Sequence, residues 1–160
     1  MDSSTTELAA LVDREKVRNC IARLARGEDR RDAGLIGDSF WPEASVDLGV
    51  FSESFDEYLA WVVPGSPVIP VTQHVLGQSV NDCIGDVALA ETHVTAHHRL
   101  VAEDGDRDTV IGGRYLDRMD KRGAHWRITQ RTSAPSRSKA DPSYQRPLVN
   151  RRDIHNPSDG

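Results

Sequence analysis

Apolar side chains near the start of the chain recur three and four positions apart, which is the period of an amphipathic helix. Ser4 and Glu7 have the spacing of a capping box, so we expect the helix to begin there. Gly27 favours its end. The sequence therefore predicts one long first helix, with apolar positions at Leu8, Leu11, Val12, Cys20, Ile21 and Leu24.

A second, shorter helix is predicted from Asp32 to Phe40. Gly34 and Gly37 weaken it, and Trp41-Pro42 would stop it because proline cannot continue a helix. Asp29 would then lie at the junction between the two helices. A junction of this kind can direct a carboxylate toward the interior of the fold.

The rest of the patterned sequence is dominated by strands. Alternation predicts a strand from Ala44 to Val50, and the spacing of apolar residues from Phe55 to Val62 predicts a third helix, closed by Pro64-Gly65. After a proline-rich connector, four strands separated by polar turns form an antiparallel meander. This order of elements indicates the α+β class, with the sheet curling round the helices. The four strands are Val71 to Val80, Asp86 to Val101, Thr109 to Met119 and His125 to Thr132.

The composition changes near Ser133, where proline, serine and charged residues replace the apolar pattern. We therefore expect one domain over residues 1–133 and a polar tail over 134–160. Two interpretations of the tail stay open. It is disordered, or Tyr144, Pro147, Leu148 and Val149 pack on a neighbouring subunit.

Composition and charge exclude several classes of function. The 160 residues with 38% hydrophobic content suffice for one domain with a core. Basic residues are scattered among acids, and the net charge of -5 argues against nucleic acid as a partner. The sequence contains neither an apolar run of the roughly 20 residues that cross a bilayer nor a basic, apolar signal peptide, so we expect no membrane partner and a cytoplasmic protein.

Cysteines and histidines give no indication of a metal or another cofactor. Cys20 and Cys83 are far apart and lack the clustering of a zinc site. His97 and His98 are neighbours on a predicted strand, where they point to opposite faces and cannot both bind one ion. We predict no metal and no cofactor.

Four stretches carry a family pattern: Gly27 to Asp32 with Phe40 to Ala44, Thr72 to Gly77, Gly85 to Thr92, and Gly113 to Arg118 with Trp126 to Arg131. In order and spacing they resemble the SnoaL-like family of the nuclear transport factor 2-like superfamily. The resemblance is to the subgroup with hexachlorocyclohexane dehydrochlorinase, scytalone dehydratase and bile-acid 7α-dehydratase. It implies a cone-shaped α+β barrel, a curved, mostly antiparallel sheet wrapped round three N-terminal helices, with a pocket for a small molecule.

The resemblance also implies a catalytic pair. In this family a histidine base is held by an aspartate, and the matching positions are His74 and Asp29. A neutral imidazole can take a proton at neutral pH, and a buried carboxylate fixes its tautomer and stabilises the imidazolium that forms. Arg131 matches a family cation that assists the leaving group or holds a polar substrate atom.

The sequence leaves parts of this site open. Strict alternation on the last strand puts Arg131 on the face opposite Trp126 unless a bulge intervenes. Some family dehydratases carry a tyrosine on the first helix that helps hydroxide leave, and this helix has none. Four further residues are candidates for contact with the substrate, namely Glu91, His93, Val46 and Leu24.

The expected function is that of a cofactor-independent lyase, a dehydratase or dehydrohalogenase, acting on a small, largely apolar compound. Steroids, terpenoids, aromatics and polyketide-like compounds fit that description. An isomerase or cyclase with the same proton shuttle stays open, and so does a non-catalytic binding module like the small subunit of a ring-hydroxylating dioxygenase. The family resemblance further implies a homo-oligomer, with a trimer favoured over a dimer.

Overall fold

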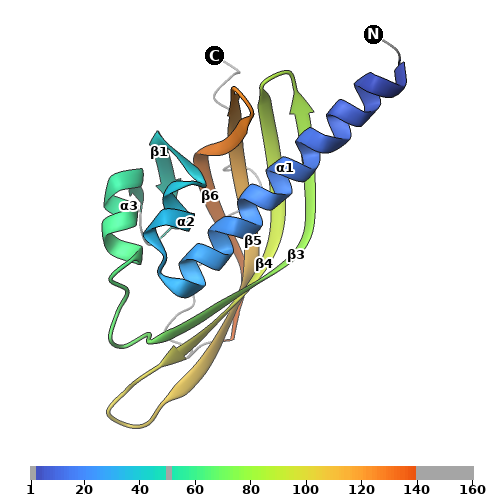
Figure 1. Ribbon diagram of the computed structural model, residues 1–160. Coiled ribbons are helices and arrows are strands. Elements are labelled where there is room, and N and C mark those ends of the chain that lie inside the picture. The colour runs from blue at the N-terminus through green and yellow to red at the C-terminus, as the bar shows by residue number, and fades with distance from the viewer. Residues whose placement is uncertain (1–2, 50–51, 140–160) are drawn as a thin grey trace, which may run out of the picture.

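The computed structural model describes residues 3–49 and 52–139 (Figure 1). Its helices are α1 (Ser3–Arg30), α2 (Ala33–Gly37) and α3 (Phe55–Val62). Its strands are β1 (Phe40–Asp47), β2 (Ser52–Ser54), β3 (Val71–Ile84), β4 (Val87–Leu100), β5 (Arg107–Arg122) and β6 (His125–Lys139).

Helix α1 crosses one face of the sheet, and its N-terminal turns project past the edge of the sheet (Figure 1). The predicted amphipathic helix is confirmed, although it begins at Ser3 and runs beyond Gly27 to Arg30. Val17, Cys20, Ile21 and Leu24 are buried in the core. The predicted apolar positions Leu8, Leu11 and Val12 remain exposed in the described chain, because the helix is longer than the sheet beneath it.

Helix α2 is shorter than predicted. Asp32 caps it by accepting hydrogen bonds from the backbone N–H groups of Gly34 and Leu35, at 2.9 and 3.0 Å. The chain leaves the helix after Gly37, so the expectation of helix as far as Phe40 was wrong. Strand β1 begins at Phe40 and contains Pro42 at a break in its pairing with β6, where the missing N–H of proline costs no ladder bond.

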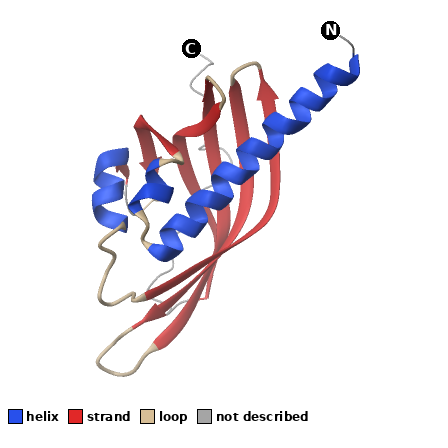
Figure 2. Ribbon diagram, in the orientation of Figure 1, coloured by secondary structure: helices blue, strands red, loops and turns tan. Residues whose placement is uncertain are grey.

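Helix α3 matches its predicted bounds. Ser54 and Glu57 form a capping box in which each side chain bonds the other's backbone N–H. Phe55 and Tyr58 face inward, and the ring of Phe55 stacks on that of Phe40 with centroids 4.8 Å apart. This packing places α3 against the β1 end of the sheet (Figure 2).

The sheet has the strand order β2-β1-β6-β5-β4-β3 and is strongly curved (Figure 1). The pairings from β3 to β6 form the predicted antiparallel meander, whereas β1 runs parallel to β6. With helices packed on one face, the fold is α+β as expected. Among the described residues β2 and β3 are free edges, so the sheet curves without closing into a complete barrel.

Strand β6 extends to Lys139, seven residues past the predicted end at Thr132. It can do so because its last residues continue to pair with β5, as far as Val110 opposite Lys139. Pro135 is tolerated next to an irregularity in that pairing. The remainder of the predicted tail, residues 140–160, lies outside the described residues.

The two faces of the sheet differ in burial. On the inner face, which packs against α1, α2 and α3, most side chains are buried, and many are apolar. On the outer face of β3 and β4, large apolar side chains are exposed; they are Val71, Val75, Val80, Ile84 and Leu89. No helix in the described part of the chain is both long and apolar enough to cross a membrane.

Candidate active site

The C-terminal end of α1 positions the first candidate residue. The backbone N–H of Arg31 donates to the backbone carbonyl of Glu28, and the N–H of Asp32 donates to the backbone carbonyl of Gly27. This is the hydrogen-bond pattern of a Schellman motif. Arg31 has a φ of 53°, in the left-handed region where glycine is usual. Asp29 therefore lies in the last turn of the helix, rather than in a junction between helices as expected.

Arg31 also fixes the segment that leads into β3. Its guanidinium donates to the carbonyl oxygens of Pro64 and Ile69, at 3.1 and 2.7 Å. These two bonds tie the proline-rich connector to the end of α1. Because β3 starts two residues after Ile69, the same contacts set the position of His74 relative to Asp29.

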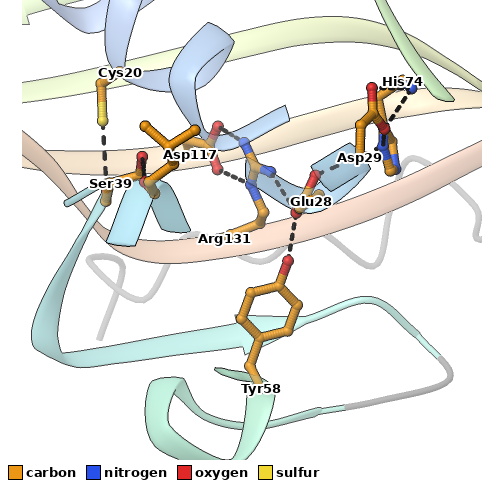
Figure 3. Close-up of polar contacts among 9 residues, drawn as sticks. Cys20, Glu28, Asp29, Ser39, Tyr58, His74, Asp117 and Arg131 are labelled. Atoms are coloured by element: carbon orange, nitrogen blue, oxygen red, sulfur yellow. Dashed lines mark hydrogen bonds and ion pairs between the residues drawn. The ribbon is translucent and has the colours of Figure 1, made fainter. Parts of the chain in front are cut away.

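Asp29 and His74 lie in direct contact (Figure 3). The Nδ1 atom of His74 is 2.7 Å from Oδ1 of Asp29, and the backbone N–H of His74 donates to both carboxylate oxygens at 2.9 and 3.1 Å. The side chain of His74 is 12% exposed and that of Asp29 is 20% exposed. A carboxylate at Nδ1 holds the proton on that nitrogen, so the lone pair of a neutral ring lies on Nε2.

The strand residues next to His74 on the inner face of the sheet are mostly apolar and form a wall beside it. Its partner across the sheet is Ala96, and the next inward pair is Leu76 with Val94. The ring of His98 meets that of His74 edge-on, with centroids 6.2 Å apart. Burial and the nearby His74 ring lower the pKa of His98, so His98 is neutral near pH 7.

Glu28 is a second buried carboxylate beside this pair. It is 7% exposed, and its Oε2 is 3.9 Å from Nδ1 of His74. Its Oε1 accepts a short hydrogen bond from the hydroxyl of Tyr58 and lies 3.8 Å from Nη1 of Arg131 (Figure 3). Burial, together with the facing Glu28, raises the pKa of Tyr58 well above its ordinary value, so the hydroxyl remains a donor.

Arg131 faces the interior because a bulge interrupts β6. Ile128 pairs with Met119 and Gln130 with Arg118, which leaves Thr129 as an extra residue. The bulge puts Arg131 on the same buried face as Trp126, and this resolves the alternative left open by strict alternation.

The guanidinium of Arg131 is held from two sides. It donates to both oxygens of Asp117, at 2.7 and 2.8 Å, and lies 4.0 Å from the ring centroid of Tyr115. Burial alone would lower the pKa of Arg131, but the ion pair with Asp117 raises it above its usual range. With 1% of its surface exposed, Arg131 is a fixed cation behind the dyad.

The structure does not bring the other four candidates to the dyad. Glu91 and His93 lie on the outer face of β4, opposite His74, with side chains 44% and 58% exposed. Their placement in a pocket with the dyad was wrong, because the inward positions of β4 are the even-numbered ones. Val46 and Leu24 are buried in the hydrophobic core, where Val46 pairs with Arg131 across β1 and β6 and Leu24 lies one turn before Glu28 on α1.

Sequence reasoning missed five residues of this polar cluster: Glu28, Tyr58, His98, Tyr115 and Asp117. For Asp117 and Tyr115, alternation along a strand gave a usable signal, because both share one face of β5. Glu28 continues the buried face of α1, four residues after Leu24, and Tyr58 lies on the apolar face of α3, three residues after Phe55, so the helical period placed both inward without showing that they meet.

Cys20 lies near the cluster without joining its chemistry. Its thiol donates to the backbone carbonyl of Ser39 at 3.4 Å (Figure 3). Burial raises the pKa of Cys20 to about 11, so the thiol stays protonated at neutral pH and is a poor nucleophile.

A separate surface groove of about 370 Å³ lies between α1 and the start of β6. It contains none of the predicted site residues. Its lining consists of Lys16, Asn19, Arg23, Asp38, Ala124, His125, Trp126 and Arg127.

Comparison with known families identifies the fold that carries this site. The model of the SnoaL-like domain matches residues 9–132, which include the dyad and the bulge of β6. The chain belongs to the SnoaL-like family. No protein of curated function matches the chain in sequence.

Solved structures agree with this SnoaL-like assignment. A hexachlorocyclohexane dehydrochlorinase, LinA type 2, is 16% identical with a TM-score of 0.75 over 90% of this chain and 99% of its own. A candidate scytalone dehydratase from Novosphingobium aromaticivorans is 18% identical, with a TM-score of 0.74 over 88% and 93%.

A third neighbour is a nuclear transport factor 2-like superfamily protein from Salmonella enterica. It is 16% identical, with a TM-score of 0.64 over 79% of this chain and 92% of its own. At these identities the likeness establishes a shared fold.

Proposed function

We propose that this SnoaL-like protein is a cofactor-independent lyase of the dehydratase or dehydrohalogenase type. Its substrate is a small, largely apolar compound with a hydrogen made acidic by a neighbouring carbonyl or similar group. The observation that carries the proposal is the 2.7 Å contact between Asp29 Oδ1 and His74 Nδ1, reinforced by the backbone N–H of His74 on the same carboxylate.

The chemistry follows from that contact. Nε2 of His74, which makes no hydrogen bond to another described residue, takes the proton from the substrate carbon. The electron pair of the broken C–H bond forms a double bond as the β-substituent leaves as hydroxide or halide. Asp29 orients the ring and stabilises the imidazolium, and the apolar wall around Ala96 and Leu76 suits an apolar substrate.

Arg131 contributes to this mechanism as a positioning residue. Its guanidinium is engaged by Asp117 and Tyr115 and is buried, so we assign it no direct contact with the leaving group. Its charge acts on the dyad through Glu28, which lies between them (Figure 3). We also expect a cytoplasmic homo-oligomer, with a trimer favoured.

The test is a screen of β-hydroxy and β-halogenated ring carbonyl compounds, followed by mass spectrometry. We expect a product lighter by one water or one hydrogen halide, and we expect the reaction to be lost in His74→Ala. His97→Ala is the matched control, because His97 lies on the outer face of β4 and is exposed.

Three other results would contradict the lyase proposal in distinguishable ways. Turnover that His74→Ala leaves unchanged would remove the histidine from the mechanism. A product of unchanged mass that depends on His74 would indicate an isomerase or cyclase. Saturable binding without turnover of any compound would indicate a binding module.

A further inference from the structure

The last turn of α1 presents two consecutive carboxylates to one histidine. Asp29 points toward β3 and bonds His74 directly. Glu28, about 100° away round the helix axis, points into the core, where 7% of its surface is exposed. A glutamate this buried needs hydrogen-bond or ion-pair partners, and the described residues supply them to only one of its two carboxylate oxygens.

One oxygen of Glu28 is well held. Oε1 accepts from the hydroxyl of Tyr58 on α3 and faces the guanidinium of Arg131 on β6. A carboxylate that accepts a hydroxyl hydrogen bond and faces a fixed cation is stabilised as the anion. The pair of Arg131 with Asp117 on β5 keeps that cation in place.

The other oxygen of Glu28 has no such partner. Oε2 is buried and makes no hydrogen bond to any of the described residues, yet it lies 3.9 Å from Nδ1 of His74. While the imidazole is neutral, this oxygen faces no compensating charge. When His74 takes a proton at Nε2, the ring becomes a cation within ion-pair distance of Oε2.

We propose that Glu28 is a positioning residue for the dyad: anchored by Tyr58 and Arg131, its free oxygen stabilises the imidazolium that His74 becomes during the reaction. This inference rests on the proposed function of Asp29 and His74. Among the described residues, His98 on β4 is the further titratable group against the His74 ring, and it is neutral near pH 7.

The experiment follows the NMR titration of the His74 ring in wild type and in Glu28→Gln. Loss of the Glu28 charge should lower the pH midpoint at which His74 gains its second ring proton by about one unit, a tenfold change in proton affinity. Glu15→Gln is the matched control, because Glu15 is exposed on the same helix, roughly 20 Å away. It should leave the midpoint unchanged.

A folded Glu28→Gln variant with the wild-type midpoint would overturn the proposal. Should Glu28→Gln fail to fold, the side-chain carboxyl carbon signal of Glu28 in the wild type decides the question. We expect an ionised Glu28 whose signal shifts at the His74 midpoint; a Glu28 that stays protonated through that titration would overturn the proposal. Neither readout needs turnover, so coupling without lyase activity would contradict only the proposed function.

Discussion

At the scale of single residues, Asp29 has two structural duties toward His74. Asp29 accepts hydrogen bonds from the backbone N–H of His74 on β3, and it also holds the imidazole ring of His74 at Nδ1. One carboxylate therefore fixes both the main chain and the side chain of the proposed base. Substitution at this position separates geometry from charge, because an amide oxygen still accepts from the backbone.

Asp29→Asn should reduce turnover strongly while the fold is kept. The asparagine retains an acceptor for the N–H of His74 but offers no anion to the imidazolium. We expect kcat/KM to fall by roughly 10²- to 10⁴-fold in steady-state assays. Circular dichroism should show an unchanged fold, and near-wild-type kcat/KM in a folded Asp29→Asn would remove the carboxylate from the mechanism.

His98 should make the fold sensitive to mild acid. Its pKa in the folded state is lowered by burial and by His74, so the unfolded chain binds the extra proton more readily. The stability this group contributes is fully present above its ordinary value of 6.5 and is lost as pH falls below it. Thermal unfolding from pH 7.5 to 5 should show a steeper loss in wild type than in His98→Gln; equal slopes would contradict this assignment.

At the scale of elements, the dyad depends on how the proline-rich connector joins α1 to β3. Arg31 bridges the two, and Gly65 lets the guanidinium lie close against the connector backbone. Gly65 has a φ of 64°, and a Cβ there would collide with the guanidinium. At Gly85, which has a φ of 60°, an added Cβ would meet no other atom within 4 Å.

Gly65→Ala should therefore destabilise the protein more than Gly85→Ala does. Both substitutions incur the left-handed backbone cost of roughly 1–2 kcal/mol. The first also displaces Arg31 from two carbonyl oxygens, which adds about 1–2 kcal/mol. Denaturant unfolding measures the difference, and equal losses in the two variants would show that the Arg31 bridge contributes nothing to stability.

The elements themselves were largely predictable, and the departures have local physical causes. Periodicity gave α1, α3 and the four-stranded meander. It overextended α2, because the cap at Asp32 and the early turn at Asp38 outweighed a weak apolar pattern. It could not place Arg131, because a one-residue bulge at Thr129 changes the face without changing composition.

At the scale of the whole molecule, Asp13 joins α1 to two strands of the sheet. Asp13 accepts from Nζ of Lys121 at 2.8 Å and from Nε1 of Trp126 at 2.9 Å, and so connects α1 with β5 and β6. Burial alone would raise the pKa of Asp13, but these two hydrogen bonds hold it below its ordinary value.

Asp13→Asn should lower the free energy of unfolding by about 1–2 kcal/mol at neutral pH. Because the folded-state pKa is depressed, the wild-type advantage is present above the ordinary value of 3.8 and is lost as pH falls through the folded value. Urea unfolding of both proteins at pH 7 and pH 3 tests this. An advantage that is the same at both pH values would contradict the assignment.

The exposed apolar side chains on the outside of β3 and β4 support the expected homo-oligomer. Ile84 is 80% exposed and Val80 is 67% exposed, and we expect these two side chains to contact a neighbouring subunit. Sedimentation equilibrium should give a mass near three times 17.7 kDa, and Ile84→Glu should shift it toward the monomer. A wild-type monomer would refute the trimer.

The site as a whole was only partly predictable from the sequence. Asp29 and His74 came from a family pattern, and the geometry joins them. The helical period puts Glu28 and Tyr58 on the inward faces of α1 and α3, but it cannot show that the two side chains meet, because that contact depends on how the two helices pack. Glu91 and His93 were candidates because composition cannot tell the two faces of a strand apart until the register is known.

The most direct test of the central claim is the protonation state of the His74 ring at neutral pH, read from long-range ¹H–¹⁵N correlations of the wild-type protein. We expect a proton on Nδ1, strongly deshielded by Asp29, and a bare Nε2 able to accept a proton from a substrate. A ring that carries its proton on Nε2, or an Nδ1 signal that Asp29→Asn leaves unchanged, would contradict it.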